Sequence, residues 1–306
     1  MTLILGTRGS RLALVQSRWV ASQLIALGAE VELKVVQTKG DQLRDVGLQD
    51  QLEKGFFTSA LEERLMDGRV DLVVHSLKDL PTVAAQGTQV ITPIREASGD
   101  VLLFKPSFAD PSRPLGLAAG TRVGTGAARR IALLTAADPE LVNVPIRGNV
   151  PTRVAKVGND VDAVVLARAG LARLGLSLNG LHGLDLVPAS WIPAPGQGAL
   201  GIQVPVEGRA AAMVARLTHA RATRDVAMER GVLGAFEGGC HAAVGASVDT
   251  QAGVLFAGAD TGTGWRCVTI SLDQTDPHLL AVQALRAGGA VQEGPWIRPL
   301  TLWETQ

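Results

Sequence analysis

The 306-residue chain is longer than one ordinary hydrophobic core supports, so we expect two or three domains. Its composition, 46% hydrophobic and 19% charged, is typical of a soluble globular protein. The formal net charge is zero, which disfavours a general nucleic-acid binder, because such proteins need a broad basic excess to displace counterions from phosphates.

The N-terminal segment MTLILGTRGSR has no basic start, and its apolar run is too short for a signal peptide. No run approaches the roughly 18 apolar residues of a membrane span. The two cysteines and five histidines show neither a disulfide framework nor metal-ligand spacing. We therefore expect a protein of the bacterial cytoplasm, with no metal and with no membrane or nucleic-acid partner.

The first part of the chain alternates apolar strands with helices, which is the pattern of an α/β fold. A glycine stands at the end of each predicted helix and supplies its stop. Strands are predicted at 2–8, 31–38 and 70–76, and helices at 12–27 and 54–68.

After the proline-rich stretch 106–116 the alternation resumes, which indicates a second α/β lobe of similar size. From about residue 209 the pattern changes to one long helix at 209–236, three short strands and a last helix, PHLLAVQALRAG. That order favours a small α+β C-terminal domain with a three-stranded antiparallel sheet.

Arginines follow four of the predicted strands. Arginine makes up 23 of the 29 basic residues, and its planar fork suits carboxylates or phosphates, although a high genomic GC content would give the same bias. A single arginine after a strand is usually a solvated charge or a surface ion pair, whereas four converging turns would hold a ligand with several carboxylates or phosphates. No glycine pattern matches a phosphate loop. These arginines are Arg8, Arg11, Arg129, Arg130, Arg147, Arg153, Arg168 and Arg173.

The segment HSLKDLP places Lys78 and Asp79 directly after an apolar strand. A carboxylate among cations stays ionised, and it can stabilise a positive charge that develops during a reaction. Considered alone, the pair is better explained as a polar cap of the loop before Pro81.

Eight motifs occur in one order: GTRGSRLAL, KGFF, VHSLKDLP, GTGAARR, IRGNVPTR, AGLARLGL, PAPGQGALGI and EGGCHAAVG. Together they resemble the porphobilinogen deaminase (hydroxymethylbilane synthase) family of tetrapyrrole biosynthesis. The resemblance runs from residue 4 to about residue 245 and weakens in the C-terminal strands.

The resemblance implies a monomer with three domains, of which the first two are similar to the α/β lobes of periplasmic binding proteins. The stretch WIPAPGQGALGIQVP would return to complete the first domain. The implied boundaries are 1–94 with 191–208 for domain 1, 95–190 for domain 2, and 209–306 for domain 3.

The resemblance further implies a transferase that joins four porphobilinogen molecules head to tail, loses ammonia at each step and releases hydroxymethylbilane. The family carries a dipyrromethane cofactor on a thioether, at the position of Cys240 here. Two glycines before Cys240 favour an accessible thiol, although a buried thiol at a helix end explains the motif better when it is considered alone.

Site residues follow from the same resemblance. Asp79 matches the catalytic aspartate, which would stabilise the cationic azafulvene formed when ammonia leaves. Each pyrrole carries two carboxylates, which forked cations can bind. The cofactor-binding positions of the family are matched by Lys78, Asp79, Arg129 and Arg130, in addition to Cys240. The substrate-binding positions are matched by Arg8, Ser10, Lys54, Arg147, Arg153 and Arg173.

Several positions depart from the family pattern. Gly126 and Ala127 stand where the family often has serines, so this chain has no hydroxyl group at either position. Ala242 and Ala243 replace the usual β-branched residue and proline after the cysteine. Arg11 replaces a common proline, and Leu52 with Glu53 replace frequent glycines.

A non-catalytic, two-lobed binding protein for a polyanionic small molecule is the alternative. It would use the same arginines, but it would need neither Asp79 nor Cys240.

Overall fold

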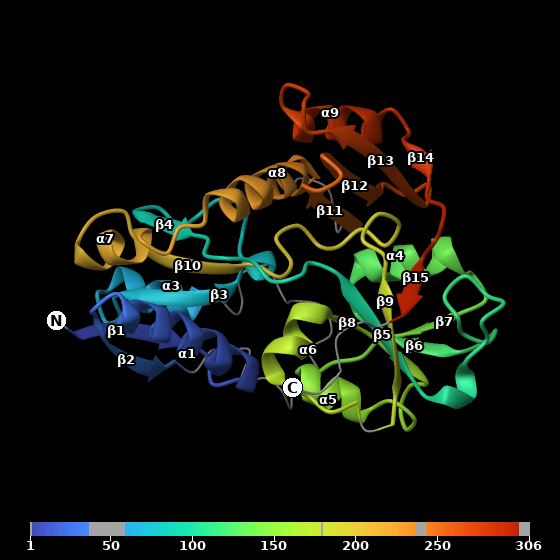
Figure 1. Cartoon of the computed structure of the whole chain (residues 1–306), viewed down its shortest axis with the longest axis horizontal. Helices are drawn as coiled ribbons and strands as arrows, with labels where there is room; N and C mark the ends of the chain where they lie inside the picture. Colours follow the sequence, from blue (N-terminus) through green and yellow to red (C-terminus); the bar gives the residue numbers. More distant parts are fainter. Residues whose placement is uncertain (1, 37–58, 179, 237–242, 300–306) are drawn as a thin grey trace. The chain divides into compact units, whose positions relative to one another are not determined.

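The structure is a computed structural model that describes residues 2–36, 59–178, 180–236 and 243–299 (Figure 1). The chain divides into two compact units, Met1–Glu96 with Ala199–Arg224, and Ala97–Gly198 with Asp225–Gln306. The three-domain division stays a prediction.

The first unit contains a mixed five-stranded sheet in the order β2-β1-β3-β10-β4. Strand β1 runs parallel to β2 and β3, whereas β10 runs antiparallel to β3 and β4. Strand β10 therefore joins this sheet although it follows β4 by more than a hundred residues. The strands are β1 Thr2–Thr7, β2 Glu30–Val35, β3 Leu72–Ser76, β4 Thr88–Ile91 and β10 Leu200–Pro205.

Helix α1 begins and ends where local chemistry predicts. The Oγ atom of Ser10 accepts a hydrogen bond from Ala13 N at 3.3 Å and so caps α1. Gly28 follows α1 with a φ of 92°, a left-handed conformation that glycine adopts without a Cβ clash. The helices are α1 Arg11–Ala26, α3 Ser59–Met66, the 3₁₀ turn η2 Leu77–Asp79 and α7 Arg209–Ala215.

The first sheet of the second unit has six strands in the order β15-β9-β5-β8-β6-β7. Strand β6 is parallel to β7 and β8, whereas β5 is antiparallel to β8 and β9. The C-terminal strand β15 pairs with β9, a pairing that the sequence does not predict. The elements are β5 Asp100–Phe104, β6 Arg122–Gly124, β7 Val142–Val144, β8 Ala163–Ala167, β9 His182–Leu186, β15 Ile297–Pro299, η3 Pro106–Phe108, α4 Ala128–Ala137, α5 Val150–Ala155 and α6 Arg168–Leu174.

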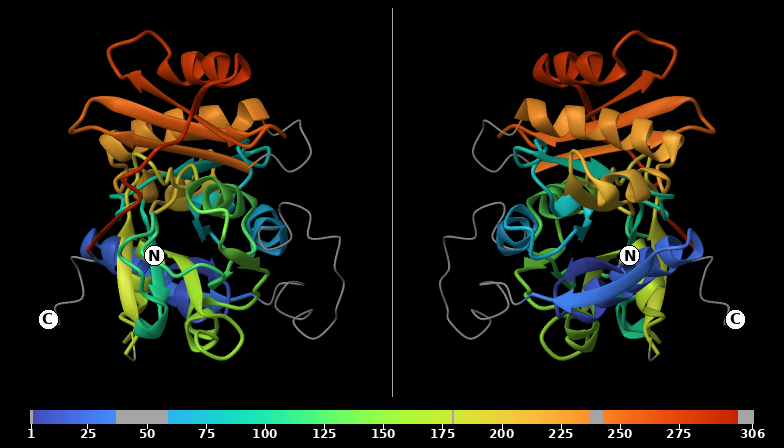
Figure 2. Two further views of the ribbon diagram at one scale, coloured as in Figure 1. Left: turned by 90° about the vertical axis from the view of Figure 1, so that its right-hand side faces the viewer. Right: turned by 90° about the vertical axis from the view of Figure 1, so that its left-hand side faces the viewer.

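The second sheet of this unit is antiparallel, with the order β11-β12-β13-β14. Helix α9 lies across one face of it and contacts β12 and β13 (Figures 1 and 2). The prediction of three strands is wrong, because this sheet has four. The additional strand is the short β14, which pairs with β13 at Arg266 and Cys267. The elements are β11 Ala243–Asp249, β12 Val254–Asp260, β13 Trp265–Ser271, β14 Ala290–Val291, α8 Ala220–Phe236 and α9 Pro277–Arg286.

The long helix predicted at 209–236 is two helices, α7 and α8. The break lies at 216–219, where His219 Nδ1 accepts a hydrogen bond from Ala222 N at 3.2 Å. This side-chain acceptor satisfies one of the backbone N–H groups left open at the start of α8, so a second helix begins there. The mixed α/β sheets and the separate antiparallel sheet confirm the predicted fold class.

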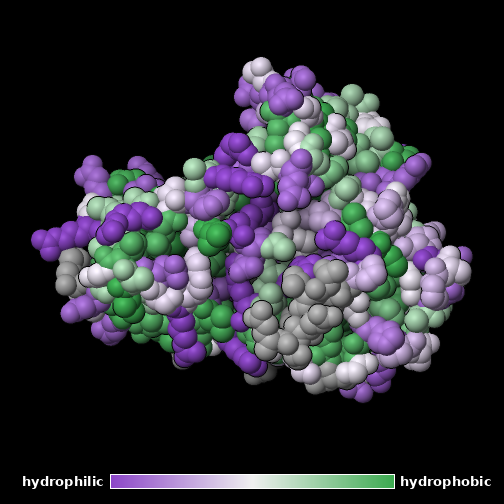
Figure 3. Space-filling model, viewed as in Figure 1, coloured by the Kyte–Doolittle hydropathy of each residue, from purple (hydrophilic) through white to green (hydrophobic). Residues whose placement is uncertain are grey.

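Polar and apolar residues are mixed on the surface drawn in Figure 3. Exposed large hydrophobic side chains belong to different elements, for example Ile25 of α1, Met66 of α3 and Leu279 of α9. Scattered side chains of this kind are ordinary for globular proteins.

Candidate functional site

In the first unit, the candidate residues lie where two parallel strands end. Strands β1 and β3 are neighbours and point the same way, so Arg8 after β1 and the η2 turn after β3 begin at one edge of the sheet. Asp79 is exposed there, and Arg8 and Lys78 are half-buried. Lys54 lies outside the described residues.

The η2 turn is anchored on both sides of the charged pair. Leu77 and Leu80 are buried, and Leu77 N donates a hydrogen bond to Ala199 O at 3.0 Å. A Cβ atom at Gly201 would lie 2.9 Å from Leu80 Cδ1 and 3.0 Å from Leu77 Cδ1, so the glycine lets β10 approach the turn closely. The two leucines therefore hold Asp79 at the surface although it directly follows a buried strand.

His75 is the buried titratable group beside this edge. Burial lowers its pKa from 6.5 to about 4; the nearby Gln203 side chain opposes this shift, and the positive charge of Arg8 adds to it. The imidazole is therefore neutral at pH 7 and adds no charge to this edge of the sheet.

The second unit brings three arginine-bearing turns to one sheet edge. Strands β6, β7 and β8 are mutually aligned and are followed by α4, α5 and α6, so the three helices start at the same edge. Arg147 is exposed, whereas Arg153 and Arg173 are half-buried. Arg153 Nε donates to Gly148 O at 2.8 Å, and Arg173 Nη2 donates to Gly198 O at 2.7 Å.

Arg129 and Arg130, in the first turn of α4, are buried and form ion pairs with Asp100. Arg129 Nη2 and Arg130 Nη2 each lie 2.7 Å from a carboxylate oxygen of Asp100. Burial alone would raise the pKa of Asp100, but Arg130 and Arg129 outweigh it and hold that pKa well below its usual range. Burial lowers the pKa of Arg129, and Asp100 opposes this shift.

Asp100 is a residue that the sequence reasoning missed. It opens the apolar strand β5 and stands opposite Ala167 at the end of β8, so it lies at the same edge as the arginine turns. A lone carboxylate at the head of an otherwise apolar strand, ASGDVLLF, is the signal that could have found it.

Arg168, which the resemblance leaves unassigned, is also buried. Its Nη1 atom donates to Asp185 Oδ2, and both side chains are almost completely excluded from solvent. The pair ties the start of α6 to β9, which is a structural function.

The two cysteines differ in what the structure describes. Cys240 lies outside the described residues. Cys267 on β13 is half-buried, with its Sγ 3.6 Å from Ala290 O, and burial raises the pKa of its thiol. A thiol with a raised pKa is a poor nucleophile, which agrees with a place on the sheet face.

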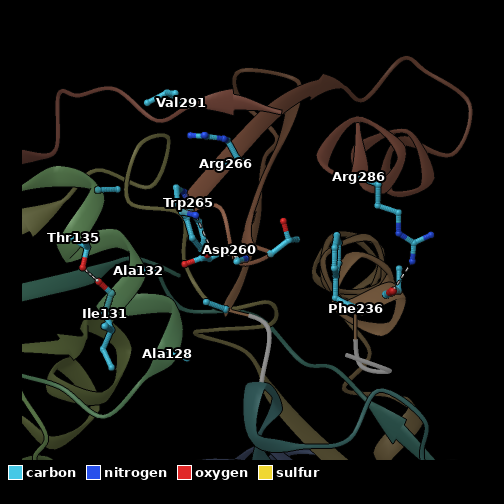
Figure 4. Close-up of a pocket in the computed structure, with 16 residues that line it drawn as sticks. Ala128, Ile131, Ala132, Thr135, Phe236, Asp260, Trp265, Arg266, Arg286 and Val291 are labelled. Atoms are coloured by element: carbon cyan, nitrogen blue, oxygen red, sulfur yellow. Dashed lines mark hydrogen bonds between the residues drawn. The ribbon is translucent and has the colours of Figure 1, made fainter. Parts of the chain in front are cut away.

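A cavity of about 1090 Å³ lies between α4 and the antiparallel sheet (Figure 4). Ile131 of α4 and Trp265 of β13 line it from opposite sides, and Arg266 stands above them in the view. Phe236 and Ala243 also line it, and these residues flank the segment that contains Cys240. Two residues that line the cavity are therefore close in sequence to Cys240, the predicted attachment point of the cofactor.

The residues that the structure describes contain neither a metal-binding cluster nor a membrane-spanning helix. Among residues 2–36, 59–178, 180–236 and 243–299, no group of three or more His, Cys, Asp or Glu side chains is arranged to hold a metal ion. Within the same ranges, no helix has the length and apolar character needed to cross a membrane.

Known proteins match this chain over most of its length. A family model described as porphobilinogen deaminase, dipyromethane cofactor binding domain, matches residues 3–212. Porphobilinogen deaminase of Desulforudis audaxviator is 41% identical over 249 residues, which are 80% of this chain and 79% of that protein. The protein of the same name from Deinococcus deserti is 38% identical over 275 residues, covering 86% of this chain and 85% of its own.

A solved structure of an ABC transporter periplasmic substrate-binding protein from Coxiella burnetii covers 74% of this chain and 96% of that one. Its sequence is 15% identical to this chain, and the TM-score is 0.41. The family model and the relatives of 38% and 41% identity show that this chain belongs to the porphobilinogen deaminase family.

Proposed function

We propose that this chain joins four porphobilinogen molecules head to tail, with loss of ammonia at each step. Water would then add to the carbon that links the tetrapyrrole to the cofactor, and the linear tetrapyrrole hydroxymethylbilane would be released. The observation that carries the proposal is the family match over residues 3–212, together with relatives that are 36% to 42% identical over about four-fifths of the chain. The same match supports a dipyrromethane cofactor and porphobilinogen as the substrate.

Asp79 is the proposed catalytic residue. Its exposed carboxylate, presented by η2, would accept hydrogen bonds from pyrrole N–H groups. A fixed negative charge there stabilises the positive charge that develops as ammonia leaves the aminomethyl group. The same carboxylate would accept the proton that is lost when each new carbon–carbon bond forms.

The arginines of the two sheet edges are the proposed substrate ligands. Every pyrrole brings an acetate and a propionate, and guanidinium forks bind such carboxylates by paired hydrogen bonds. Exposed Arg147 and half-buried Arg8, Arg153 and Arg173 are accessible enough for this role. Ser10 and Lys54 would add polar contacts.

The residues at the start of α4 fit a cofactor that carries carboxylates. The first turn of α4 contains no acidic residue, and two guanidinium groups against the single carboxylate of Asp100 leave a net positive charge beside the positive end of the helix dipole. Arg129, Arg130 and Lys78 would hold the cofactor, and Cys240 would bind it through a thioether. When bound, the dipyrromethane supplies the pyrrole ring to which the first substrate is joined.

Intact mass of the denatured protein tests the proposal. The wild-type chain should carry the mass of two linked pyrroles, Cys240→Ala should lack it, and Cys267→Ala should keep it. A wild-type chain that stays unmodified after porphobilinogen is added would contradict the proposal and favour a simple binding protein for polyanions.

The proposal includes a cytoplasmic monomer, as expected for this biosynthetic family. Light scattering of the purified protein should give the mass of one chain, 31.9 kDa before the cofactor is added. A stable dimer would contradict this part of the proposal without affecting the chemistry.

A further inference from the structure

Asp100 carries a buried carboxylate that accepts five hydrogen bonds, and it is 1% exposed. Oδ2 accepts from Arg129 Nη2 at 2.7 Å, Arg130 Nε at 3.2 Å and Trp191 Nε1 at 3.1 Å. Oδ1 accepts from Arg130 Nη2 at 2.7 Å and Gln197 Nε2 at 2.9 Å. The carboxylate is therefore fixed from several directions.

Both arginine forks are held on a second side by backbone oxygens. Arg129 Nη1 donates to Ile192 O at 2.8 Å, and Arg130 Nη1 donates to Val165 O at 2.9 Å. A planar guanidinium that is bound at two of its edges cannot rotate, so the direction of its remaining N–H groups is set.

Part of the binding capacity of the arginines remains after these contacts. Two guanidinium groups carry ten N–H donors, and the contacts above use two from Arg129 and three from Arg130. Asp100 offsets one of the two positive charges, so the cluster keeps a net charge of about +1 for an anion.

We propose that Asp100 is a positioning residue that sets Arg129 and Arg130 for the carboxylates of the bound pyrroles. This inference rests on the proposed function, in which these arginines hold the cofactor. Asp100 itself does not touch the reacting atoms. It acts by fixing the orientation of the two forks before the pyrroles bind.

The same carboxylate is tied to the segments where the chain enters and leaves the second unit. Gln197 Nε2, which donates to Asp100, also donates to Ser98 O at 2.6 Å and Gly99 O at 3.2 Å. The unit begins at Ala97 and its first segment ends at Gly198. Through Asp100 and Gln197, the arginine pair is thus connected to the backbone of Ser98 and Gly99 at the start of this unit.

The test compares Asp100→Asn with Asp185→Asn. Asp185 is an equally buried acid of the same unit, but its buried partner is Arg168. Cofactor-free protein of each variant receives porphobilinogen, and intact mass measures the rate of covalent loading.

We expect the loading rate of Asp100→Asn to fall by about 10- to 100-fold and the KM for porphobilinogen to rise. The reason is that a displacement of about 1 Å in a positioned group lowers a rate by about that factor. Asp185→Asn should load within about twofold of the wild type, because its partner Arg168 is not one of the proposed cofactor ligands.

Two results would overturn the inference: loading of Asp100→Asn at the wild-type rate, or equal slowing of both variants after correction for the folded fraction. If Asp100→Asn does not fold, Asp100→Glu against Asp185→Glu makes the same comparison, because the charge is kept and only the reach of the carboxylate changes. An unmodified wild-type chain would overturn the proposed function as well, whereas a loaded wild type with unaffected variants overturns this inference alone.

Discussion

Asp79 and Asp100 both stand next to basic residues at one end of a strand, but they differ in their exposure to solvent. Asp79 is exposed on a 3₁₀ turn at the end of β3. Asp100 is buried at the start of β5 and is enclosed by two guanidinium groups, an indole and an amide.

The difference shows that burial decides which task a carboxylate can perform. A carboxylate that accepts five internal hydrogen bonds is stabilised as a fixed charge and has little capacity left for a substrate. An exposed carboxylate on an anchored turn keeps its oxygens accessible to pyrrole N–H groups. Asp79 suits chemistry, and Asp100 suits the orientation of other residues.

The largest expected effect is on turnover in Asp79→Asn. Loss of the negative charge should lower the turnover number by about 10²- to 10⁴-fold, the usual range for a general acid–base or electrostatic group. The free energy of unfolding should change by no more than about 0.5 kcal/mol, because the side chain is exposed. Steady-state kinetics and urea unfolding check both values, with the exposed Asp67→Asn as a control. Near-normal turnover in Asp79→Asn would contradict the catalytic role proposed for Asp79.

Asp100→Ala should show the reverse pattern in stability. Removing the carboxylate leaves two buried guanidinium groups without their counter-charge, which should lower the free energy of unfolding by about 3–5 kcal/mol. The matched change Asp79→Ala should cost less than about 1 kcal/mol. Urea unfolding followed by circular dichroism measures both. Equal losses in the two variants would remove the distinction between them.

His75 sharpens the comparison, because it lies close to Asp79 in the chain but is buried like Asp100. Its pKa falls from 6.5 to about 4 on folding, so between these pH values the unfolded chain binds the extra proton. The contribution of neutral His75 to the free energy of unfolding is therefore fully present above pH 6.5. It is lost as the pH falls towards 4, which amounts to about 3 kcal/mol for this pKa shift.

Urea unfolding at several pH values checks the expectation for His75. The pH dependence between 6.5 and 4 should be shallower in His75→Gln, which cannot titrate, while carboxylates contribute to both proteins below about pH 5. The same slope in both proteins would show that another group carries the effect.

The smallest expected effect concerns one helix cap in each unit. Ser10→Ala and Asn149→Ala each remove a side-chain acceptor, for Ala13 N at 3.3 Å and Thr152 N at 3.0 Å, and each should lower stability by about 1 kcal/mol. Since Ser10 is also a predicted substrate contact, only Ser10→Ala should raise the KM for porphobilinogen. An equal rise in both variants would indicate that the caps act through helix stability alone.

Local sequence patterns determined much of the fold. The strand predicted at 2–8 is Thr2–Thr7, and the helix predicted at 12–27 is Arg11–Ala26. These elements depend on apolar periodicity, a capping serine and a terminal glycine, all of which lie within a few residues of one another. The ordered motifs likewise identified the family, because each motif is a short stretch of consecutive residues.

Only the tertiary structure decided which distant segments meet. Strands β14 and β15 are two and three residues long, too short to show a periodicity, and they are strands because β13 and β9 supply hydrogen-bonding partners. Asp100 lies 30 residues from Arg130, 91 from Trp191 and 97 from Gln197 in the chain. Burial and ion pairing depend on such long-range neighbours, which local patterns do not encode, so the sequence revealed the two arginines and the structure revealed the aspartate that holds them.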